Sequence, residues 1–459
     1  MSFFNITQFG WQNYKNEAFG IITLALPMFI AQIAQVGTGF VDTVMAGHLG
    51  QADLAAVGVG SNIFITVYVT FLGIATSLNP ILSQQFGSGA KLELGETVRQ
   101  GLWFCFGLGI VGMISLLLLT IPLHTHLSMS EYTRDTTILF VIGTSLAMPA
   151  AMLHRALHAY ASSLNKSTPI MIVSLLALSL NVPFNYILMH GLFGLPKLGG
   201  AGCGFGTALA FWVNFLALFI YLSKSQYFKP FGLMQRFSWP NWQRMKEFIK
   251  LGLPIGLSFF LEVSLFSFIA LLIVQFGEVY IATQQAVINV TSIIYMLPQT
   301  TSAALSVRVA QAIGARSYAR ARHISGVGIT MGMVVAICTA SLVLLFRESI
   351  ISIYTNDPQI IKVGATLLIF AAFFQLSDAI QTIASGALRG YKLTKVAMII
   401  HAISFWGFGL GVGCYLGLVL QMGLYGFWTA LNISLFVAAI LLVSYLLNRS
   451  KAFLVRDHY

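Results

Sequence analysis

LPMFIAQIAQVGTGFVDTVMAGHLG, residues 26–50, returns in altered form 227 residues later as LPIGLSFFLEVSLFSFIALLIVQFG, residues 253–277. Both stretches begin with Leu-Pro, have Val ten residues after the Leu and end with Gly. The same offset joins further identical pairs: Ala55 and Ala282, Asn62 and Asn289, Tyr68 and Tyr295, Gln84 and Gln311, Gly87 and Gly314, Gly101 and Gly328, and Met171 and Met398. One ungapped offset over this length indicates that the chain contains two copies of one structural unit.

The composition excludes an ordinary water-soluble protein. Hydrophobic residues make up 57% of the 459 residues and charged residues only 8%, whereas a soluble domain has about 25% charged residues. Apolar runs of about 20 residues, the length that crosses a bilayer as a helix, recur along the chain. We expect twelve membrane-spanning helices, because backbone in lipid must satisfy its own hydrogen bonds. The expected spans are 19–47, 54–83, 99–122, 136–157, 169–190, 201–223, 248–275, 279–305, 324–346, 360–386, 395–417 and 423–447.

The basic residues predict the orientation in the membrane. The net charge is +11, but the 25 Lys and Arg are not gathered in one patch, so we expect no nucleic-acid partner. With a cytoplasmic N-terminus, only four of them would lie outside: Arg134, Lys197, Arg347 and Lys362. This positive-inside bias predicts that both termini are cytoplasmic. We expect no cleaved signal peptide, because residues 1–17 lack a basic segment followed by a cleavage site.

The longest polar connection, Lys224–Lys250, predicts the boundary between the copies. We divide the chain into an N-terminal six-helix bundle (1–223), a cytoplasmic linker (224–247) and a C-terminal six-helix bundle (248–459). Six spans return the chain to the same side of the membrane, so the two bundles are parallel repeats. Such duplication is typical of secondary transporters, whose halves move about a site near the middle of the membrane.

Three carboxylates fall inside apolar spans: Asp42, Glu262 and Asp378. Each costs about 2.5–3.5 kcal/mol to insert, and such residues usually face the bundle interior and mark ion or proton pathways. No Lys or Arg lies near the middle of these spans. A buried carboxylate without such a partner is either protonated or binds a cation, and both states suit an antiporter. The alternative is a structural carboxylate held by nearby Ser, Thr or amide groups.

The duplication does not copy these charges. The offset aligns Glu262 with Gln35, Asp42 with Ile269 and Asp378 with Ala151. The N-terminal half instead offers Asn181 and Asn185, which lie four residues apart on one helix face. The eighth span carries Gln284, Gln285 and Tyr295. These polar residues either line a cavity or form hydrogen bonds between helices.

Other motifs indicate neither catalysis nor ATP hydrolysis. The glycine-rich segment 199–204 lacks the Gly-Lys-Ser/Thr ending of a phosphate loop, so we assign it to helix packing. A membrane prenyltransferase would need paired acids on a cytoplasmic loop, and the chain has none. A flippase for lipid-linked precursors is the alternative transporter, but its cavity should be basic, whereas the charges in these spans are acidic. The four cysteines lie in apolar spans and suggest neither disulfides nor zinc. We expect no enzyme activity and no cofactor.

Several of these segments resemble the MATE family of multidrug and toxic compound extrusion transporters, in particular its bacterial NorM-like branch. The resemblance covers almost the whole chain. It is carried by Ala25-Leu26-Pro27, by Gly39-Phe40-Val41-Asp42-Thr43-Val44-Met45-Ala46-Gly47, by Asn181-Val182-Pro183-Phe184-Asn185, by Phe260-Leu261-Glu262 and by Ser385-Gly386-Ala387-Leu388-Arg389-Gly390.

The resemblance implies two six-helix bundles around a central cavity in a bacterial inner-membrane protein, which we expect to be a monomer. It implies export of organic cations, such as ethidium-like and fluoroquinolone-like drugs, against Na⁺ or H⁺ influx by alternating access. The implied coupling-cation residues are Glu262, Asp378 and Tyr295, with either Na⁺ or H⁺ as the cation held at the two acids. The implied substrate contacts are Asp42, Phe266, Gln285 and Asp357. One departure is Phe374, since some relatives have Tyr at that position.

Overall fold

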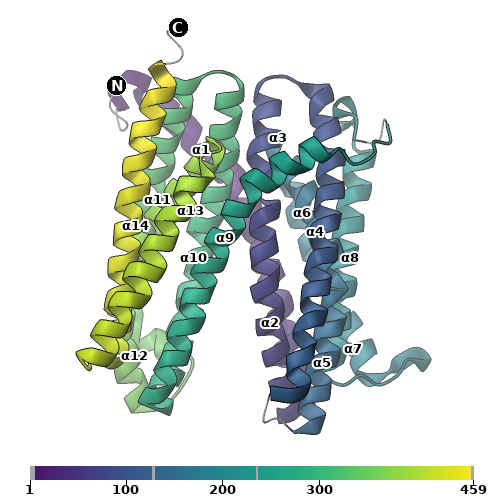
Figure 1. Cartoon of the computed structure of the whole chain (residues 1–459), viewed down its shortest axis with the longest axis vertical. Helices are drawn as coiled ribbons and strands as arrows, with labels where there is room; N and C mark the ends of the chain where they lie inside the picture. Colours follow the sequence, from purple (N-terminus) through teal and green to yellow (C-terminus); the bar gives the residue numbers. More distant parts are fainter. Residues whose placement is uncertain (1–5, 127–129, 234–235, 456–459) are drawn as a thin grey trace. The chain divides into compact units, whose positions relative to one another are not determined.

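The computed structural model describes residues 6–126, 130–233 and 236–455, which are almost entirely helical (Figure 1). The first half contains α1 (Ile6–Leu49), α2 (Gln51–Ala75), α3 (Leu78–Gly87), α4 (Lys91–His126), α5 (Glu131–Ser145), α6 (Ala147–Ser163), α7 (Thr168–His190) and α8 (Ala201–Lys224). The second contains α9 (Trp242–Ile273), α10 (Glu278–Gly314), α11 (Tyr318–Ser352), α12 (Pro358–Gly390), α13 (Thr394–His401) and α14 (Gly423–Val455). Two π-helical segments, Ala402–Val412 and Tyr415–Val419, continue α13.

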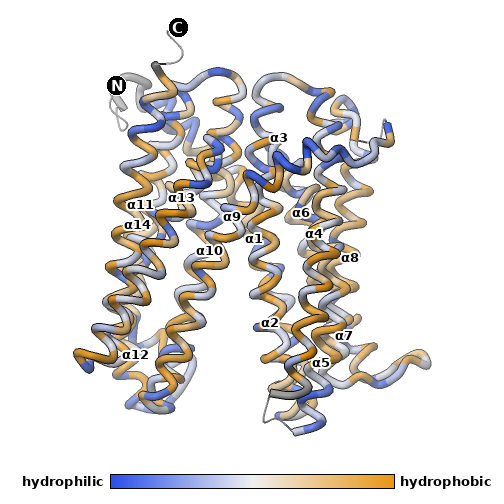
Figure 2. The backbone as a smooth tube through the Cα atoms, viewed as in Figure 1, coloured by the Kyte–Doolittle hydropathy of each residue, from blue (hydrophilic) through white to orange (hydrophobic). Residues whose placement is uncertain are grey.

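These helices confirm the predicted all-helical membrane fold with two repeats. Within the described ranges, eleven helical segments are long and apolar enough to cross a membrane, and their apolar lengths are seen in Figure 2. The remaining predicted span, 279–305, is the 37-residue helix α10. Its hydropathy is lower because it carries polar residues in the membrane segment, including Gln284, Gln285 and Tyr295. The helix that departs most from an ordinary membrane span is therefore one that holds candidate site residues.

The backbone keeps the 227-residue offset. Helices α2 and α10 begin at Gln51 and Glu278, α4 and α11 at Lys91 and Tyr318, and α6 and α12 end at Ser163 and Gly390. Beyond these last two ends, Asn165 and Lys392 both have a left-handed φ of 58°. Residues 227 apart therefore occupy equivalent places in the two halves.

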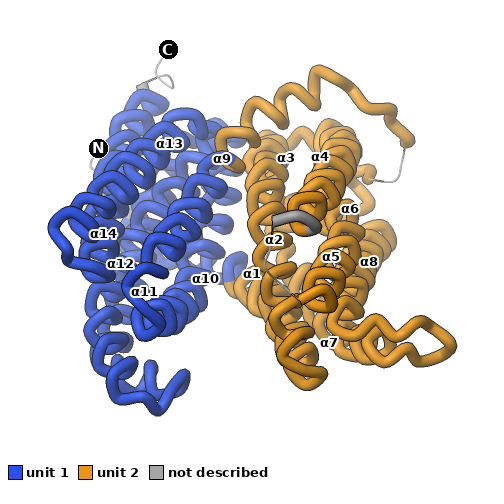
Figure 3. Tube along the Cα trace, turned by 60° about the horizontal axis from the view of Figure 1, so that its bottom comes forward, with its two compact units in different colours: residues 1–25, 257–459 blue, residues 26–256 orange. Residues whose placement is uncertain are grey.

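The chain forms two compact units, shown in Figure 3. The N-terminal unit is Leu26–Gly256, and the C-terminal unit combines Met1–Ala25 with Leu257–Tyr459. The units therefore divide inside α1 and α9, close to Pro27 and Pro254, and not at the polar linker on which the sequence division rests.

Polar contacts explain this division. The Nε of Arg99 in α4 donates to Ser238 Oγ at 3.0 Å, and Gln100 donates to the Trp239 carbonyl at 2.8 Å. These bonds attach the linker to the N-terminal unit. The buried Glu17 of α1 pairs with Arg308 and with Arg320, the latter at 2.7 Å, which holds the start of α1 in the C-terminal unit.

The glycine-rich segment packs helices, as predicted. A Cβ added at Gly202 would lie 2.7 Å from the Met189 nitrogen, and one at Gly204 would lie 2.5 Å from the Phe140 carbonyl oxygen. These separations are too short for a side chain. Glycines in α8 therefore allow the close approach of α5 and α7, which fixes the position of the polar residues between α7 and α8.

Candidate functional site

The three predicted coupling residues come together in the C-terminal unit. Glu262 lies in α9, Tyr295 in α10 and Asp378 in α12. The Tyr295 hydroxyl is a hydrogen-bond partner of Glu262, and Asp378 lies close enough to Glu262 to repel it electrostatically. Asp378 is only 4% exposed, and Glu262 is half-buried. Two carboxylates and a phenol from three helices thus share one site.

A polar network on α12 holds Asp378 in place. Gln381 Nε2 donates to Asp378 Oδ1 at 2.9 Å, and His401 Nε2 lies 3.1 Å from Gln381 Oε1. The side chain of Thr382 is a further hydrogen-bond partner of both Asp378 and Tyr295. The sequence analysis did not identify Gln381 or Thr382. Gln381 and Thr382 could have been found, because residues three and four positions beyond Asp378 lie beside it on a helix.

A buried arginine lies below this network. Arg389 was expected in a cytoplasmic loop, but α12 continues to Gly390 and places this residue in its last turn. Its Nη2 donates to Ser302 Oγ at 2.7 Å, and Ser302 donates to the Thr382 carbonyl at 2.6 Å. The guanidinium acts electrostatically on Glu262 and therefore partly offsets the negative charge of the site.

A small cavity with a few polar lining residues adjoins Asp378. Its volume is about 20 Å³, and its lining includes Tyr295, Thr301, Thr339, Gln375 and Asp378. The amide of Gln375 is 6% exposed, and neither its oxygen nor its nitrogen has a protein hydrogen-bond partner. A cavity of this size holds one water molecule. Carboxylate, hydroxyl and amide oxygens are the ligands that hard cations prefer, so the residues fit either a proton site with water or a small monovalent cation.

A second acidic cluster lies in the N-terminal unit. Asp42 of α1 is 3% exposed, and both its carboxylate oxygens accept hydrogen bonds. Asn185 Nδ2 donates to Oδ1 at 2.6 Å, and Thr207 Oγ1 donates to Oδ2 at 2.6 Å. Asn181 joins the cluster through Asn185 and through Thr207, at 3.3–3.4 Å.

This second cluster combines residues that the sequence analysis had treated separately. Asp42 was assigned to substrate, whereas Asn181 and Asn185 were assigned to a polar site in the N-terminal half. The structure brings all three together and adds Thr207, which carried no signal of its own in the sequence. Asp42 is thus held by amide and hydroxyl donors, the arrangement given above as the structural alternative.

Phe266 belongs to an aromatic cluster with edge-to-face and tilted rings in the C-terminal unit. Its ring centroid lies 6.0 Å from that of Phe374, which in turn lies 5.7 Å from Trp428. Trp428 Nε1 donates to Gln284 Oε1 at 2.7 Å. Phe374, which replaces the Tyr of some relatives, is therefore a packed core residue, and Gln284 is used in a helix–helix hydrogen bond.

The structure does not bring Gln285 or Asp357 into either cluster. Gln285 is exposed on α10. Asp357 is exposed and accepts a hydrogen bond from the Gln359 backbone nitrogen at 2.8 Å, so it caps the start of α12. At 1.5 Å per residue, Asp357 lies about 30 Å along the helix from Asp378.

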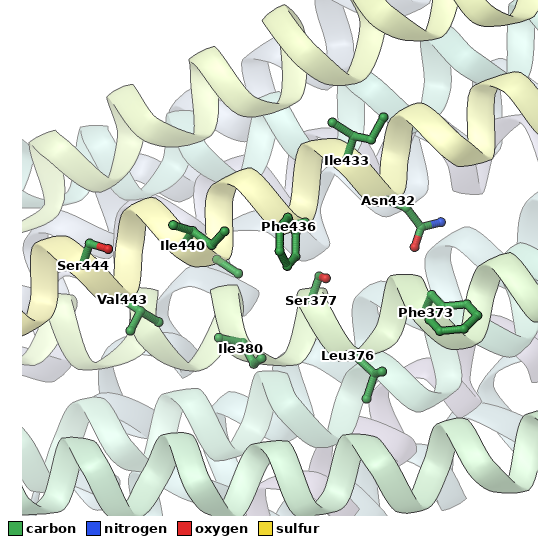
Figure 4. Close-up of a pocket in the computed structure, with 11 residues that line it drawn as sticks. Phe373, Leu376, Ser377, Ile380, Asn432, Ile433, Phe436, Ile440, Val443 and Ser444 are labelled. Atoms are coloured by element: carbon green, nitrogen blue, oxygen red, sulfur yellow. The ribbon is translucent and has the colours of Figure 1, made fainter. Parts of the chain in front are cut away.

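An apolar groove of about 690 Å³ lies between α12 and α14 (Figure 4). Phe373 and Phe436 are among its lining residues, and its polar side chains are Ser377, Asn432 and Ser444. Asn432 already donates to the Phe370 and Trp428 carbonyls at 3.1 and 2.9 Å. The groove has no charged side chain, so it is separate from the two acidic clusters and would accept apolar material.

Comparison with known proteins agrees with the fold and the repeat. A family model described as MatE matches residues 27–187 and 254–414, two segments that are themselves 227 residues apart. A relative from Chromobacterium violaceum, named "Probable multidrug resistance protein NorM", is 56% identical over 445 residues, 96% of each chain. Another of the same name, from Neisseria meningitidis serogroup B, is 50% identical over 454 residues, 99% of each chain.

Solved structures agree as well. The MATE transporter NorM-NG, solved in complex with a ligand and a monobody, superposes with a TM-score of 0.81, at 46% sequence identity and 95% coverage of both chains. The eukaryotic transporter AtDTX14 superposes with a TM-score of 0.86 at 18% identity, over 96% of this chain and 99% of its own, and that likeness concerns the fold alone.

Proposed function

Since this chain belongs to the MATE family of multidrug transporters, we propose that it exports organic cations across the bacterial inner membrane in exchange for Na⁺ or H⁺. Relatives named as multidrug resistance proteins, and the ligand complex of NorM-NG, support an organic substrate. The observation that carries the coupling proposal is the carboxylate pair Glu262 and Asp378 beside a cavity of about 20 Å³.

The physical reason why a cation would bind at this site is the repulsion between its two carboxylates. Two ionised carboxylates that are close together in the membrane repel each other, and Arg389 supplies only one positive charge for both. A proton or a Na⁺ ion at Glu262 and Asp378, with the Tyr295 hydroxyl as neighbour, removes the excess negative charge. The uptake of a cation is thus favoured in any conformation that keeps the three residues together and opens them to the outside.

Exchange follows from linkage. If the cation favours one conformation and the drug the other, each ligand weakens the binding of the other. One charge that enters down a potential of 100 mV supplies about 2.3 kcal/mol. We assign substrate contacts to Asp42, Phe266, Gln285 and Asp357, as the family resemblance implies, with both termini cytoplasmic and the chain acting as a monomer.

The test is ethidium efflux from proteoliposomes with the membrane potential clamped. A Na⁺ gradient and a pH gradient are imposed separately on wild type, on Glu262→Gln and on Glu278→Gln, a matched change at a carboxylate exposed at the start of α10. We expect one gradient to drive efflux in wild type and Glu278→Gln but not in Glu262→Gln. Gradient-driven efflux by Glu262→Gln would refute the coupling role, and no efflux by wild type under either gradient would refute cation-coupled export of ethidium-like compounds.

A further inference from the structure

The N-terminal unit contains a copy of the coupling site in which both acids are missing. At the offset of 227, Glu262 corresponds to Gln35, Tyr295 to Tyr68 and Asp378 to Ala151. The pairing is nevertheless kept, because Gln35 Nε2 donates to the Tyr68 hydroxyl just as Tyr295 pairs with Glu262. The two copies thus share the layout of the site, but only the C-terminal copy has the two acids.

The N-terminal copy has an arginine at the position where the C-terminal copy has a threonine hydroxyl. Arg155 of α6 corresponds to Thr382, the hydrogen-bond partner of Asp378 and Tyr295. Arg155 Nη2 lies 3.4 Å from Thr76 Oγ1, and its Nη1 lies 3.4 Å from His158 Nδ1. At the position where the C-terminal copy has a neutral hydroxyl that bonds to Asp378 and Tyr295, the N-terminal copy therefore has a positively charged side chain.

The guanidinium lies toward the equivalent of the C-terminal cavity. Arg155 interacts electrostatically with Tyr68 and Cys105. Their counterparts, Tyr295 and Gly332, both line the cavity beside Asp378. The positive charge of Arg155 thus acts on the residues of the N-terminal unit that are equivalent to those lining the cavity beside Asp378.

The rest of this space is filled with apolar atoms. Thr301, Thr339 and Gln375 of the C-terminal cavity correspond to Ile74, Gly112 and Met148. Met148 is fully buried, and its terminal methyl lies 2.3 Å from the position that a Cβ at Gly112 would occupy. The side chain that replaces Gln375 therefore fills the volume that Thr339 and the cavity take in the other half.

No carboxylate among the described residues forms an ion pair with Arg155. Its closest titratable neighbours are His154 and His158 from α6, Tyr68 from α2 and Cys105 from α4, none of which is an acid that is ionised at neutral pH. A guanidinium remains charged under all physiological conditions. The charge at this position is thus permanent and is not the partner of a particular acid.

We propose that Arg155 is a built-in cation that closes the N-terminal copy of the coupling site to Na⁺ and H⁺, so that each chain has a single exchangeable site of this kind. The proposal rests on the proposed function of Glu262 and Asp378. It predicts that Arg155 prevents cation binding even when the missing acids are restored.

The test transplants the C-terminal residues into the N-terminal copy. In an Asp378→Asn background, which disables the C-terminal site, one variant carries Gln35→Glu and Ala151→Asp and keeps Arg155. The other carries the same changes together with Arg155→Thr. The thermal midpoint of each purified full-length protein is measured in NaCl, in choline chloride of equal ionic strength, and in choline chloride over a pH series.

We expect saturating Na⁺ or H⁺ to raise the midpoint of the Thr variant by several degrees, since a ligand that binds only the folded state stabilises it. We expect no such shift where Arg155 is kept. Equal shifts in both variants, or no shift in a folded Thr variant, would overturn the role of Arg155. Absence of a cation-dependent shift in wild type that Asp378→Asn removes would instead overturn the proposed C-terminal site.

A second pair of variants, with fewer substitutions, tests the proposal even if the variants with the transplanted acids do not fold. In the same Asp378→Asn background, Gln35→Glu alone places an acid next to Tyr68, on which Arg155 acts electrostatically, and should give a midpoint that does not depend on the cation. Gln35→Glu with Arg155→Met, which has a similar length but no charge, should be less stable in choline and recover in Na⁺ or at low pH. A cation-independent midpoint for this double variant would contradict the proposal.

Discussion

Gly206→Ala is expected to break the Asp42 cluster without changing any polar residue in it. A Cβ at Gly206 would lie 2.0 Å from Asn185 Oδ1 and 3.0 Å from the Asn185 backbone nitrogen. The Asn185 side chain must then move and lose its 2.6 Å hydrogen bond to Asp42. Asp42 would keep the Thr207 hydroxyl and Asn181 as partners.

The magnitude follows from the bond that is lost. A hydrogen bond to a charged group is worth about 1.5–3 kcal/mol, and the buried group left without its partner adds about 1–3 kcal/mol. The helix preference of Ala over Gly returns about 1 kcal/mol. The net loss of unfolding free energy is therefore about 1.5–5 kcal/mol, or roughly 3–20 °C in the thermal midpoint for a unit of this size.

The assay is thermal unfolding of the purified protein followed by intrinsic fluorescence, with Gly58→Ala as the matched control. Gly58 is also a helical glycine of the N-terminal unit, and nothing lies within 4 Å of a Cβ placed there. We expect the control to be neutral or slightly more stable than wild type. If Gly206→Ala unfolded within about 1 °C of Gly58→Ala, the reasoning about Asn185 and Asp42 would be refuted.

Three further changes have outcomes set by the structure. Asp357→Ala removes a helix cap and should cost about 0.5–2 kcal/mol in thermal unfolding, whereas loss of ethidium efflux in a folded Asp357→Ala protein would show a role beyond the cap. Glu17→Gln weakens the pairs with Arg308 and Arg320 and should lower the midpoint, because breaking a buried ion pair costs about 3–5 kcal/mol; an unchanged midpoint would contradict this. Gln375→Met copies the N-terminal half and should raise the midpoint without cations, since it removes an unsatisfied buried amide worth about 1–3 kcal/mol. A lower midpoint in choline chloride would argue against that account.

The sequence predicted those parts of the fold that the bilayer imposes. Span length follows from the thickness of the bilayer, and the duplicated Leu-Pro segments predict that the two halves share their helices; the observed helices agree with both. The acids at Glu262 and Asp378 stood out because ionisable groups are rare in apolar spans. Their shared site with Tyr295 is a tertiary fact, but the family resemblance had already placed the three residues together.

The sequence could not predict partners that depend on helix rotation and helix ends. Thr207 is one of many small polar residues in membrane helices, and only the approach of α8 to α1 gives it Asp42 as a partner. Arg389 was placed in a loop because a basic residue near the end of a span ordinarily marks the cytoplasmic surface, whereas α12 extends to Gly390 and buries it. The sequence also did not predict that α1 and α9 are each divided between the two units, because hydropathy does not indicate which unit a helix contacts.

The two halves show why a transporter built by duplication can place its coupling chemistry on one side only. A ligand shifts a conformational equilibrium only by the difference in its affinity for the two states. Asp42 is fully supplied with donors by Asn185 and Thr207, and Arg155 carries its own permanent charge into the N-terminal copy. Glu262 and Asp378 also have hydrogen-bond partners, but they are two carboxylates that repel each other with the single charge of Arg389 nearby, and the amide of Gln375 next to them has no protein partner. The C-terminal cluster is therefore the place where adding or removing one cation changes the free energy most, so coupling is expected to depend on that half of the duplicated backbone.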